Sequence, residues 1–308
     1  MSLDRRSFIQ TAGLSAAAIS FTSALAHAAH HEPNIGMCDW NLGGSCKPEL
    51  IPKAAEAHLN GLQVSVATNP NNVPLRDPKV REKYLELGEK HNIKFSSVAA
   101  GSILNSIPLA TEPQSAVYVI DAVEAAQALG CKNILMAFFG NGDLVLTDAT
   151  NKKRNLSNDK FNEFELDSQK VTRVVEVLKQ IVPRAADAGV ALGLENTITA
   201  KQNLEIIERV GSEWLQVYYD IGNSTGNGYN VPEEIRLLGN DRICEIHLKD
   251  WDTRFFPDGK GMVKWDEVAQ ACKDINYDKW YVLETSGRDK KFMEDTHENI
   301  KFAKNLLA

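Results

Sequence analysis

The strongest constraint on the fold is a regular alternation of two periodicities from residue 34 to the end of the chain. Short apolar runs, many rich in β-branched or aromatic residues, have the pattern of buried strands. Each is followed by a segment with helical spacing of its apolar side chains. The predicted strands are Asn34–Asp39, Gly61–Ala67, Ile93–Val98, Lys132–Phe138, Val190–Glu195, Gln216–Asp220, Ile243–Leu248 and Trp280–Glu284.

The predicted helices complete the pattern. Gly130 and Gly189 directly follow two of them, where a glycine commonly ends a helix. Eight strand–helix units within ~275 residues predict an α/β fold of the (β/α)8 TIM-barrel type. The alternative is an open doubly wound sheet, but no GxGxxG motif follows the first strand. The predicted helices are Lys47–Ala57, Pro78–His91, Gln114–Leu129, Leu166–Ala188, Lys201–Val210, Val231–Leu238, Lys264–Lys273 and Lys291–Leu307.

Residues 1–28 have the features of a Tat-type signal peptide. The pair Arg5-Arg6 precedes a weakly apolar run, Thr11–Leu25, and small residues flank cleavage points at Ala26 and Ala28. We therefore expect export by the Tat route to the periplasm, with residues 29–308 forming a single barrel domain. An uncleaved N-terminal segment is the alternative.

Composition narrows the classes of partner. The net charge of −7 argues against a nucleic-acid partner. No apolar run reaches the ~18 residues that a membrane span needs. The five cysteines are scattered and odd in number, so they do not form a disulfide framework. The sequence leaves open whether Cys38 pairs with Cys46, and whether the protein forms a homo-oligomer. The longest stretch without periodicity, Gly140–Phe164, is predicted to be an active-site loop or lid.

Four successive predicted strands carry a metal-ligating residue type at or near their ends: Glu195, Asp220, His247 and Glu284. Active sites of such barrels lie at the carboxyl ends of the strands, so these side chains should converge. Each alone has an ordinary explanation, such as a helix cap, a turn or a buried histidine. Together, three carboxylates on one rim would repel one another unless a cation neutralised them. The set predicts one divalent cation, with Mn²⁺, Mg²⁺, Co²⁺ and Zn²⁺ as candidates.

Several motifs then resemble a known family, the xylose isomerase-like barrels: LENT, YYDIGN, EIHLKD, DGKGMVKWDEV and VLETS. That family includes sugar-phosphate isomerases and epimerases, ketose 3-epimerases, inosose dehydratases and the endonuclease IV group. The resemblance implies that the four residues hold the metal, with Mn²⁺ foremost, and that Glu195 and Glu284 also exchange the substrate proton. It further implies substrate binding by Arg254 and Lys249. Asn223 stands where the epimerases commonly have histidine, and Trp40 lies near a strand end where it would line a sugar pocket.

The expected activity is isomerisation or epimerisation of a free sugar, keto-sugar or related polyol through an enediolate. Export argues against a phosphorylated substrate. Two alternatives remain at this point. One is a lyase or dehydratase of the inosose or 3-keto-sugar type, which shares the first proton transfer. The other is a non-catalytic periplasmic sugar-binding protein.

Overall fold

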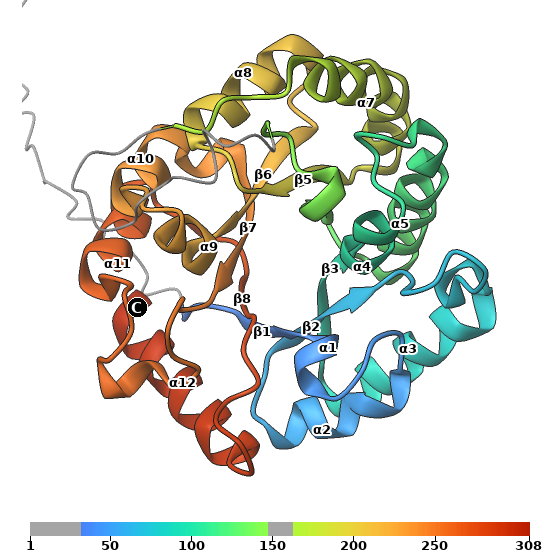
Figure 1. The fold of residues 1–308 in the computed structure, drawn as a ribbon. Coiled ribbons are helices and arrows are strands. Elements are labelled where there is room, and N and C mark those ends of the chain that lie inside the picture. Colours follow the sequence, from blue (N-terminus) through green and yellow to red (C-terminus); the bar gives the residue numbers. More distant parts are fainter. Residues whose placement is uncertain (1–31, 147–162) are drawn as a thin grey trace, which may run out of the picture. The chain divides into compact units, whose positions relative to one another are not determined.

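The computed structural model describes residues 32–146 and 163–308. Within these ranges eight parallel strands pair in chain order and close into a barrel, confirming the predicted (β/α)8 fold (Figure 1). The first and last strands pair to close the barrel, with Ile35 in register with Tyr281. The strands are β1 (Ile35–Cys38), β2 (Gly61–Ser65), β3 (Lys94–Ala99), β4 (Asn133–Phe138), β5 (Ala191–Asn196), β6 (Leu215–Asp220), β7 (Ile243–Leu248) and β8 (Tyr281–Leu283).

Helices surround the strands because their apolar faces pack on the outward-facing strand residues (Figure 1). Gly130 and Gly189 are left-handed C-caps, as predicted, with φ of 78° and 67°. The α-helices that follow the strands are α2 (Ile51–Glu56), α3 (Pro78–His91), α5 (Ala116–Leu129), α7 (Ser168–Ala188), α8 (Ala200–Val210), α10 (Val231–Arg242), α11 (Trp265–Asp274) and α12 (Phe292–Leu307).

Short helices at the loops were not predicted, because a single turn carries no detectable periodicity. The α-helical ones are α1 (Asp39–Leu42), α4 (Gly101–Ser106) and α9 (Ile221–Gly226). The 3₁₀ turns are η1 (Pro48–Leu50), η2 (Pro74–Arg76), η3 (Pro113–Ser115), η4 (Gly140–Gly142) and η5 (Phe256–Asp258). The predicted helix Lys47–Ala57 is therefore divided between η1 and α2. The predicted end of the α10 helix at Leu238 precedes Gly239, where the backbone leaves the helical conformation.

The outer and inner faces of the barrel wall are packed differently. The outer face contacts the helices through a continuous apolar core. The inner face is mixed, since a small apolar cluster that includes Tyr218 and Cys244 shares the interior with buried polar side chains. The fully buried members of that polar group include Gln63, Ser97 and Glu245.

All five cysteines are free thiols. The Cys38 thiol donates to Gln63 Oε1 at 3.2 Å, whereas the Cys46 thiol donates to the carbonyl of Ser65 at 3.1 Å. Burial raises the pKa of both thiols to about 12. No described helix has both the length and the apolar character of a membrane crossing. The predicted signal peptide and residues 147–162 of the predicted loop Gly140–Phe164 lie outside the described residues.

Candidate metal centre and sugar pocket

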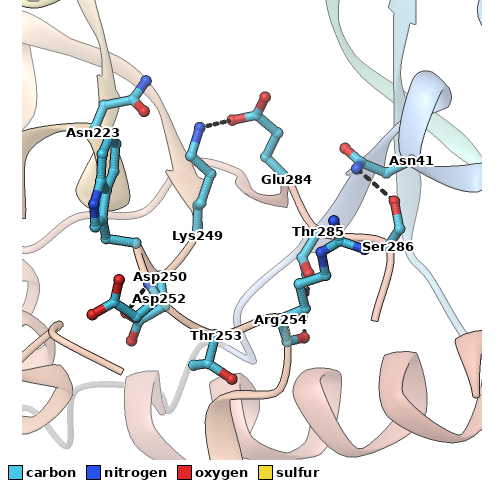
Figure 2. Close-up of a pocket in the computed structure, with 11 residues that line it drawn as sticks. Asn41, Asn223, Lys249, Asp250, Asp252, Thr253, Arg254, Glu284, Thr285 and Ser286 are labelled. Carbon is cyan, nitrogen blue, oxygen red and sulfur yellow. Dashed lines mark hydrogen bonds and ion pairs between the residues drawn. The ribbon is translucent and has the colours of Figure 1, made fainter. Parts of the chain in front are cut away.

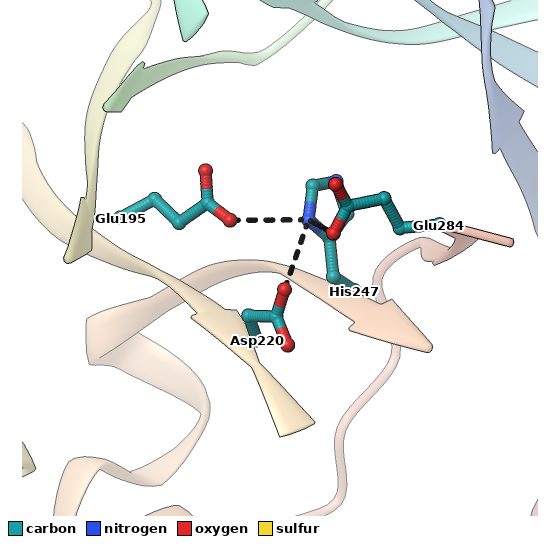
Figure 3. Close-up of side chains that lie close together, drawn as sticks. All are labelled: Glu195, Asp220, His247 and Glu284. Carbon is teal, nitrogen blue, oxygen red and sulfur yellow. Dashed lines mark ion pairs between the residues drawn. The ribbon is translucent and has the colours of Figure 1, made fainter. Parts of the chain in front are cut away.

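The barrel brings the four predicted ligands together at one rim. Glu195 lies on β5, Asp220 ends β6, His247 lies on β7, and Glu284 directly follows β8. Each offers a ligand atom, and these atoms all lie within 4.8 Å of one another. The Nδ1 atom of His247 is 3.5 Å from Glu195 Oε1, 3.7 Å from Asp220 Oδ2 and 3.5 Å from Glu284 Oε2 (Figure 3). The site is therefore a compact group of three carboxylates around one imidazole nitrogen.

The donor set fits a divalent cation. The Nδ1 atom of His247 is buried and makes no hydrogen bond, and the buried Oδ2 atom of Asp220 makes none beside its ion pair with Lys249 at 3.1 Å. A buried polar atom without a hydrogen bond is costly and rare, so Nδ1 suggests a missing partner. The other oxygen of Asp220 is occupied, because Oδ1 accepts the backbone N–H of Asn223 at 2.7 Å and caps α9. Three carboxylates and one imidazole suit a hard or borderline divalent ion.

Burial and close charges displace the pKa values at this site in different directions. Burial and the neighbouring charges of Asp220 and Glu195 raise the pKa of Glu284 to about 7, although His247 acts the other way. Burial also opposes ionisation of Asp220, but Lys249 and His247 outweigh it and hold the pKa of Asp220 below its usual range. For His247, burial opposes the charged ring. Cys38 and the carboxylates of Asp220 and Glu195 outweigh that effect and raise the pKa of His247 well above its ordinary value.

Lys249 forms one edge of the carboxylate group. Its ammonium nitrogen is 2.7 Å from Glu284 Oε2 (Figure 2). The same nitrogen is 3.1 Å from Asp220 Oδ2. Burial opposes its charge, but these two carboxylates raise the pKa of Lys249 above its ordinary value. The close approach depends on Gly222 of α9, where a Cβ atom would lie 2.8 Å from Lys249 Cγ. Lys249 is therefore a fixed positive charge at the site.

A cavity of about 420 Å³ opens beside Glu284 and Lys249 (Figure 2). Most side chains that line this cavity are polar or charged. They can exchange hydrogen bonds with a ligand that carries many hydroxyl groups. Arg254 lies in its wall, where the Arg254 carbonyl accepts from Thr285 Oγ1 at 3.2 Å and Asn299 Nδ2 at 3.0 Å. The residues that line the cavity are Asn41, Asn223, Lys249, Asp250, Trp251, Asp252, Thr253, Arg254, Glu284, Thr285 and Ser286.

The predicted substrate-binding residues thus separate into two groups. Arg254, Asn223 and Lys249 line the cavity. Trp40 does not line it. The Trp40 ring meets the imidazole of His247 edge-on at 6.3 Å between centroids and packs on the apolar cluster inside the barrel. Asn41, the next residue along the chain, is the one that faces the cavity, where it donates to Ser286 Oγ.

Sequence reasoning missed the polar groups beneath the site. Gln63 Oε1 lies 3.0 Å from His247 Nε2, so it contacts the ring on the side away from the carboxylates. Tyr218 and Glu245 lie farther inside the barrel and join the same hydrogen-bonded group. The sequence does contain a sign of these polar groups. Glu245 precedes His247 by two residues and so shares its face of the strand, and Gln63 is a large polar residue in a mostly apolar strand.

Comparison with known proteins places the chain in a family. The model of the family described as "Xylose isomerase-like TIM barrel" matches residues 51–306. The chain is 30% identical over 120 residues to a D-psicose 3-epimerase of Enterocloster bolteae, covering 36% of this chain and 39% of that protein. It is 33% identical over 126 residues to a putative L-ribulose-5-phosphate 3-epimerase of Escherichia coli K12, covering 36% of this chain and 44% of that protein.

The alignments therefore span less than half the length of either curated relative. A similar solved structure is the 3-keto-D-glucoside 4-epimerase of E. coli, with a TM-score of 0.67 and 14% identity over 89% of this chain and 99% of that one. At that identity the likeness concerns the fold, which agrees with the closed barrel described above. Because the family model covers most of the residues, the chain belongs to the xylose isomerase-like TIM barrel family.

Proposed function

We propose that this protein is a divalent-metal-dependent isomerase or epimerase of a free sugar or keto-sugar. One observation carries the proposal: Glu195 and Glu284 extend toward the same point from opposite sides of the site, and Asp220 and His247 complete a four-residue ligand set there (Figure 3). The names of the relatives, D-psicose 3-epimerase and putative L-ribulose-5-phosphate 3-epimerase, support the same reaction class.

The mechanism follows from what each side chain can reach. A divalent cation held by the four residues would polarise the substrate carbonyl and stabilise the negative charge of an enediolate. One glutamate carboxylate removes the carbon-bound proton, and the other delivers a proton from the opposite face. Delivery to the same carbon gives the epimer, and delivery to the neighbouring carbon gives the isomer. Lys249 donates to Glu284 Oε2 at 2.7 Å and so fixes the orientation of that carboxylate.

The cavity beside the ligands would hold the rest of the sugar. Arg254, Asn223 and Lys249 present donors and acceptors along its wall, as hydroxyl recognition requires. Trp40 packs edge-on beside the His247 ring, with 6.3 Å between the ring centroids. Mn²⁺ is the cation we propose first, with Mg²⁺, Co²⁺ and Zn²⁺ as further candidates, because the ligands include three carboxylates and no thiolate.

A lyase is the second candidate, and one contact favours it. The Lys249 ammonium lies next to Glu284, so a third proton-bearing group is within reach of the reacting atoms. In a dehydratase that group would donate a hydrogen bond to the departing hydroxyl and stabilise its developing negative charge. The 3-keto-D-glucoside 4-epimerase of E. coli shares this fold, so 3-keto-sugars are suitable substrates for testing this candidate.

Solvent-deuterium experiments separate these functions. The purified protein is loaded with Mn²⁺ and incubated in D₂O with free ketoses, and separately with 3-keto-glucosides. An epimerase or isomerase gives a product that has gained deuterium and lost no water. A lyase gives a product that has lost water. Thermal stabilisation by the sugar without exchange or product would show a sugar-binding protein instead and would refute the enzymatic proposal.

We further propose export by the Tat route to the periplasm. The support is the pair Arg5-Arg6 ahead of the weakly apolar run Thr11–Leu25, which lies outside the described residues. The Tat route carries folded proteins, so a metal loaded before export would remain bound. A free sugar rather than a sugar phosphate suits that location.

A further inference from the structure

A hydrogen-bonded group of polar side chains fills the barrel interior beneath the ligand set. At its centre the carboxylate of Glu245 is fully buried. Four side-chain donors surround it, three at Oε1 and one at Oε2, so Glu245 is the acceptor in each of these contacts. The donors are Tyr218 Oη at 2.6 Å, Ser97 Oγ at 2.9 Å, Ser96 Oγ at 3.0 Å and Asn133 Nδ2 at 3.0 Å.

This arrangement fixes the direction of the next hydrogen bonds. A hydroxyl has one hydrogen, and both Tyr218 and Ser97 use theirs on Glu245. Each hydroxyl oxygen can therefore only accept from the side-chain amide of Gln63. Gln63 Nε2 lies 2.6 Å from Tyr218 Oη and 3.0 Å from Ser97 Oγ, so both amide hydrogens are used.

The amide oxygen of Gln63 consequently points the other way, at His247. Gln63 Oε1 is 3.0 Å from His247 Nε2 and also accepts from the Cys38 thiol at 3.2 Å. An amide oxygen has no hydrogen to give, so the hydrogen between these atoms belongs to His247 Nε2. In the neutral ring the lone pair then lies on the other nitrogen, Nδ1, which is the nitrogen that faces the three carboxylates.

We infer that Glu245 and Gln63 are positioning residues for the metal centre. Through the hydroxyls of Tyr218 and Ser97, the buried carboxylate sets one direction of hydrogen bonding, which keeps the hydrogen on His247 Nε2 and presents Nδ1 to the cation. The inference rests on the proposed metal site and adds to it the residues that orient its only nitrogen ligand. Outer contacts of this kind typically change metal affinity about 10–100-fold when removed.

The test uses three variants of the full chain. Glu245→Gln keeps the shape but adds two donors, so the hydrogen bonds can reverse. Gln63→Met keeps the volume but removes the acceptor for Nε2–H. Ser96→Ala is the matched control, because it removes a donor to Glu245 that is not on the route to Gln63. The Zn²⁺ affinity of each variant is measured in competition with a chelator. Glu245→Gln and Gln63→Met should bind Zn²⁺ about 10–100-fold more weakly than wild type, and the affinity of Ser96→Ala should lie within about twofold of the wild-type value.

A second readout does not depend on the metal or on the variants. In ¹⁵N-histidine-labelled wild-type protein, His247 should show a slowly exchanging hydrogen on Nε2, both with and without Zn²⁺. A histidine at this buried position with its only hydrogen on Nδ1, or unchanged Zn²⁺ affinity in both folded variants, would overturn the inference. If the wild type binds no divalent metal, the proposed function fails, while the Nε2 signal still decides the direction of the hydrogen bonds.

Discussion

The carboxylates of Glu195 and Glu284 reach the imidazole of His247 from opposite sides, and one oxygen of each lies 3.5 Å from Nδ1 (Figure 3). Glu195 lies on β5 and Glu284 directly follows β8, and these two strands are not neighbours in the barrel. A substrate bound between them would expose one face to each carboxylate. The proposed two-base proton exchange needs that geometry, and the first prediction tests it.

Glu195→Gln and Glu284→Gln should each lower turnover about 10²–10⁴-fold, because an amide cannot act as a general acid or base. If the two act on opposite faces, one variant should still exchange substrate hydrogen with solvent while forming no epimer. Deuterium incorporation is measured beside product formation in metal-loaded protein. Glu176→Gln, on the exposed face of α7, serves as the control. Near wild-type turnover in either variant would leave that residue as a ligand only.

A divalent cation should raise the melting temperature, because it binds the native state alone. At a free metal concentration 100 times Kd the expected gain is about 2.7 kcal/mol. Asp220→Asn and His247→Ala should both weaken metal binding and reduce this gain in stability, while far-UV circular dichroism still reports the barrel. Differential scanning calorimetry across a series of Mn²⁺ concentrations measures the gain. Wild-type affinity in both variants would place the metal elsewhere.

Metal affinity should fall as the pH is lowered through neutrality. In protein prepared without metal, burial and nearby carboxylates raise the pKa of Glu284 to about 7, so a proton occupies the ligand below that pH. The metal must displace this proton, so Glu284 alone should lower the affinity roughly tenfold per pH unit below 7. The raised pKa of His247 adds a second proton to displace and makes the dependence steeper. Above pH 7 the contribution of Glu284 becomes constant. Calorimetric titrations in buffers of different ionisation enthalpy count the released protons, and a pH-independent affinity would contradict the prediction.

Two glycines of α9 should differ in their tolerance of alanine. A Cβ at Gly222 would lie 2.9 Å from the carbonyl oxygen of Lys249, a backbone atom that cannot move without distorting the end of β7. A Cβ at Gly226 would overlap the Trp251 indole, which is 49% exposed and has room to rotate. Gly222→Ala should therefore cost about 1–3 kcal/mol of unfolding free energy, and Gly226→Ala less than about 1 kcal/mol. Urea denaturation measures the unfolding free energy of both variants, and equal losses would contradict the prediction.

Replacing Arg5 and Arg6 together with lysine should keep the protein in the cytoplasm, because the twin-arginine pair is the address that the Tat route reads. Cell fractionation with a periplasmic marker measures the distribution. N-terminal sequencing of the exported wild type should find a start near His27 or Ala29. Normal periplasmic accumulation of the double variant would rule out the Tat route.

The local pattern of the sequence determined the elements and the identity of the rim residues. The predicted strand Ile243–Leu248 and the predicted helix Pro78–His91 coincide with the observed ones, and each other observed strand overlaps its predicted range. Periodicity of two or 3.6 residues is a local property, so a window of sequence contains it. The position of Glu195, Asp220, His247 and Glu284 near strand ends is equally local.

Only the tertiary structure decided what those residues meet. The pairing of Ile35 with Tyr281 closes the ring, and no local window contains both residues. The same closure brings Gln63 of β2 to His247 of β7, and Tyr218 of β6 to Gln63, across the barrel interior. Strand order and register determine such contacts, and both depend on the packing of the whole barrel. The sequence therefore predicted which groups supply the chemistry, and the closed barrel decided which of them share a hydrogen bond.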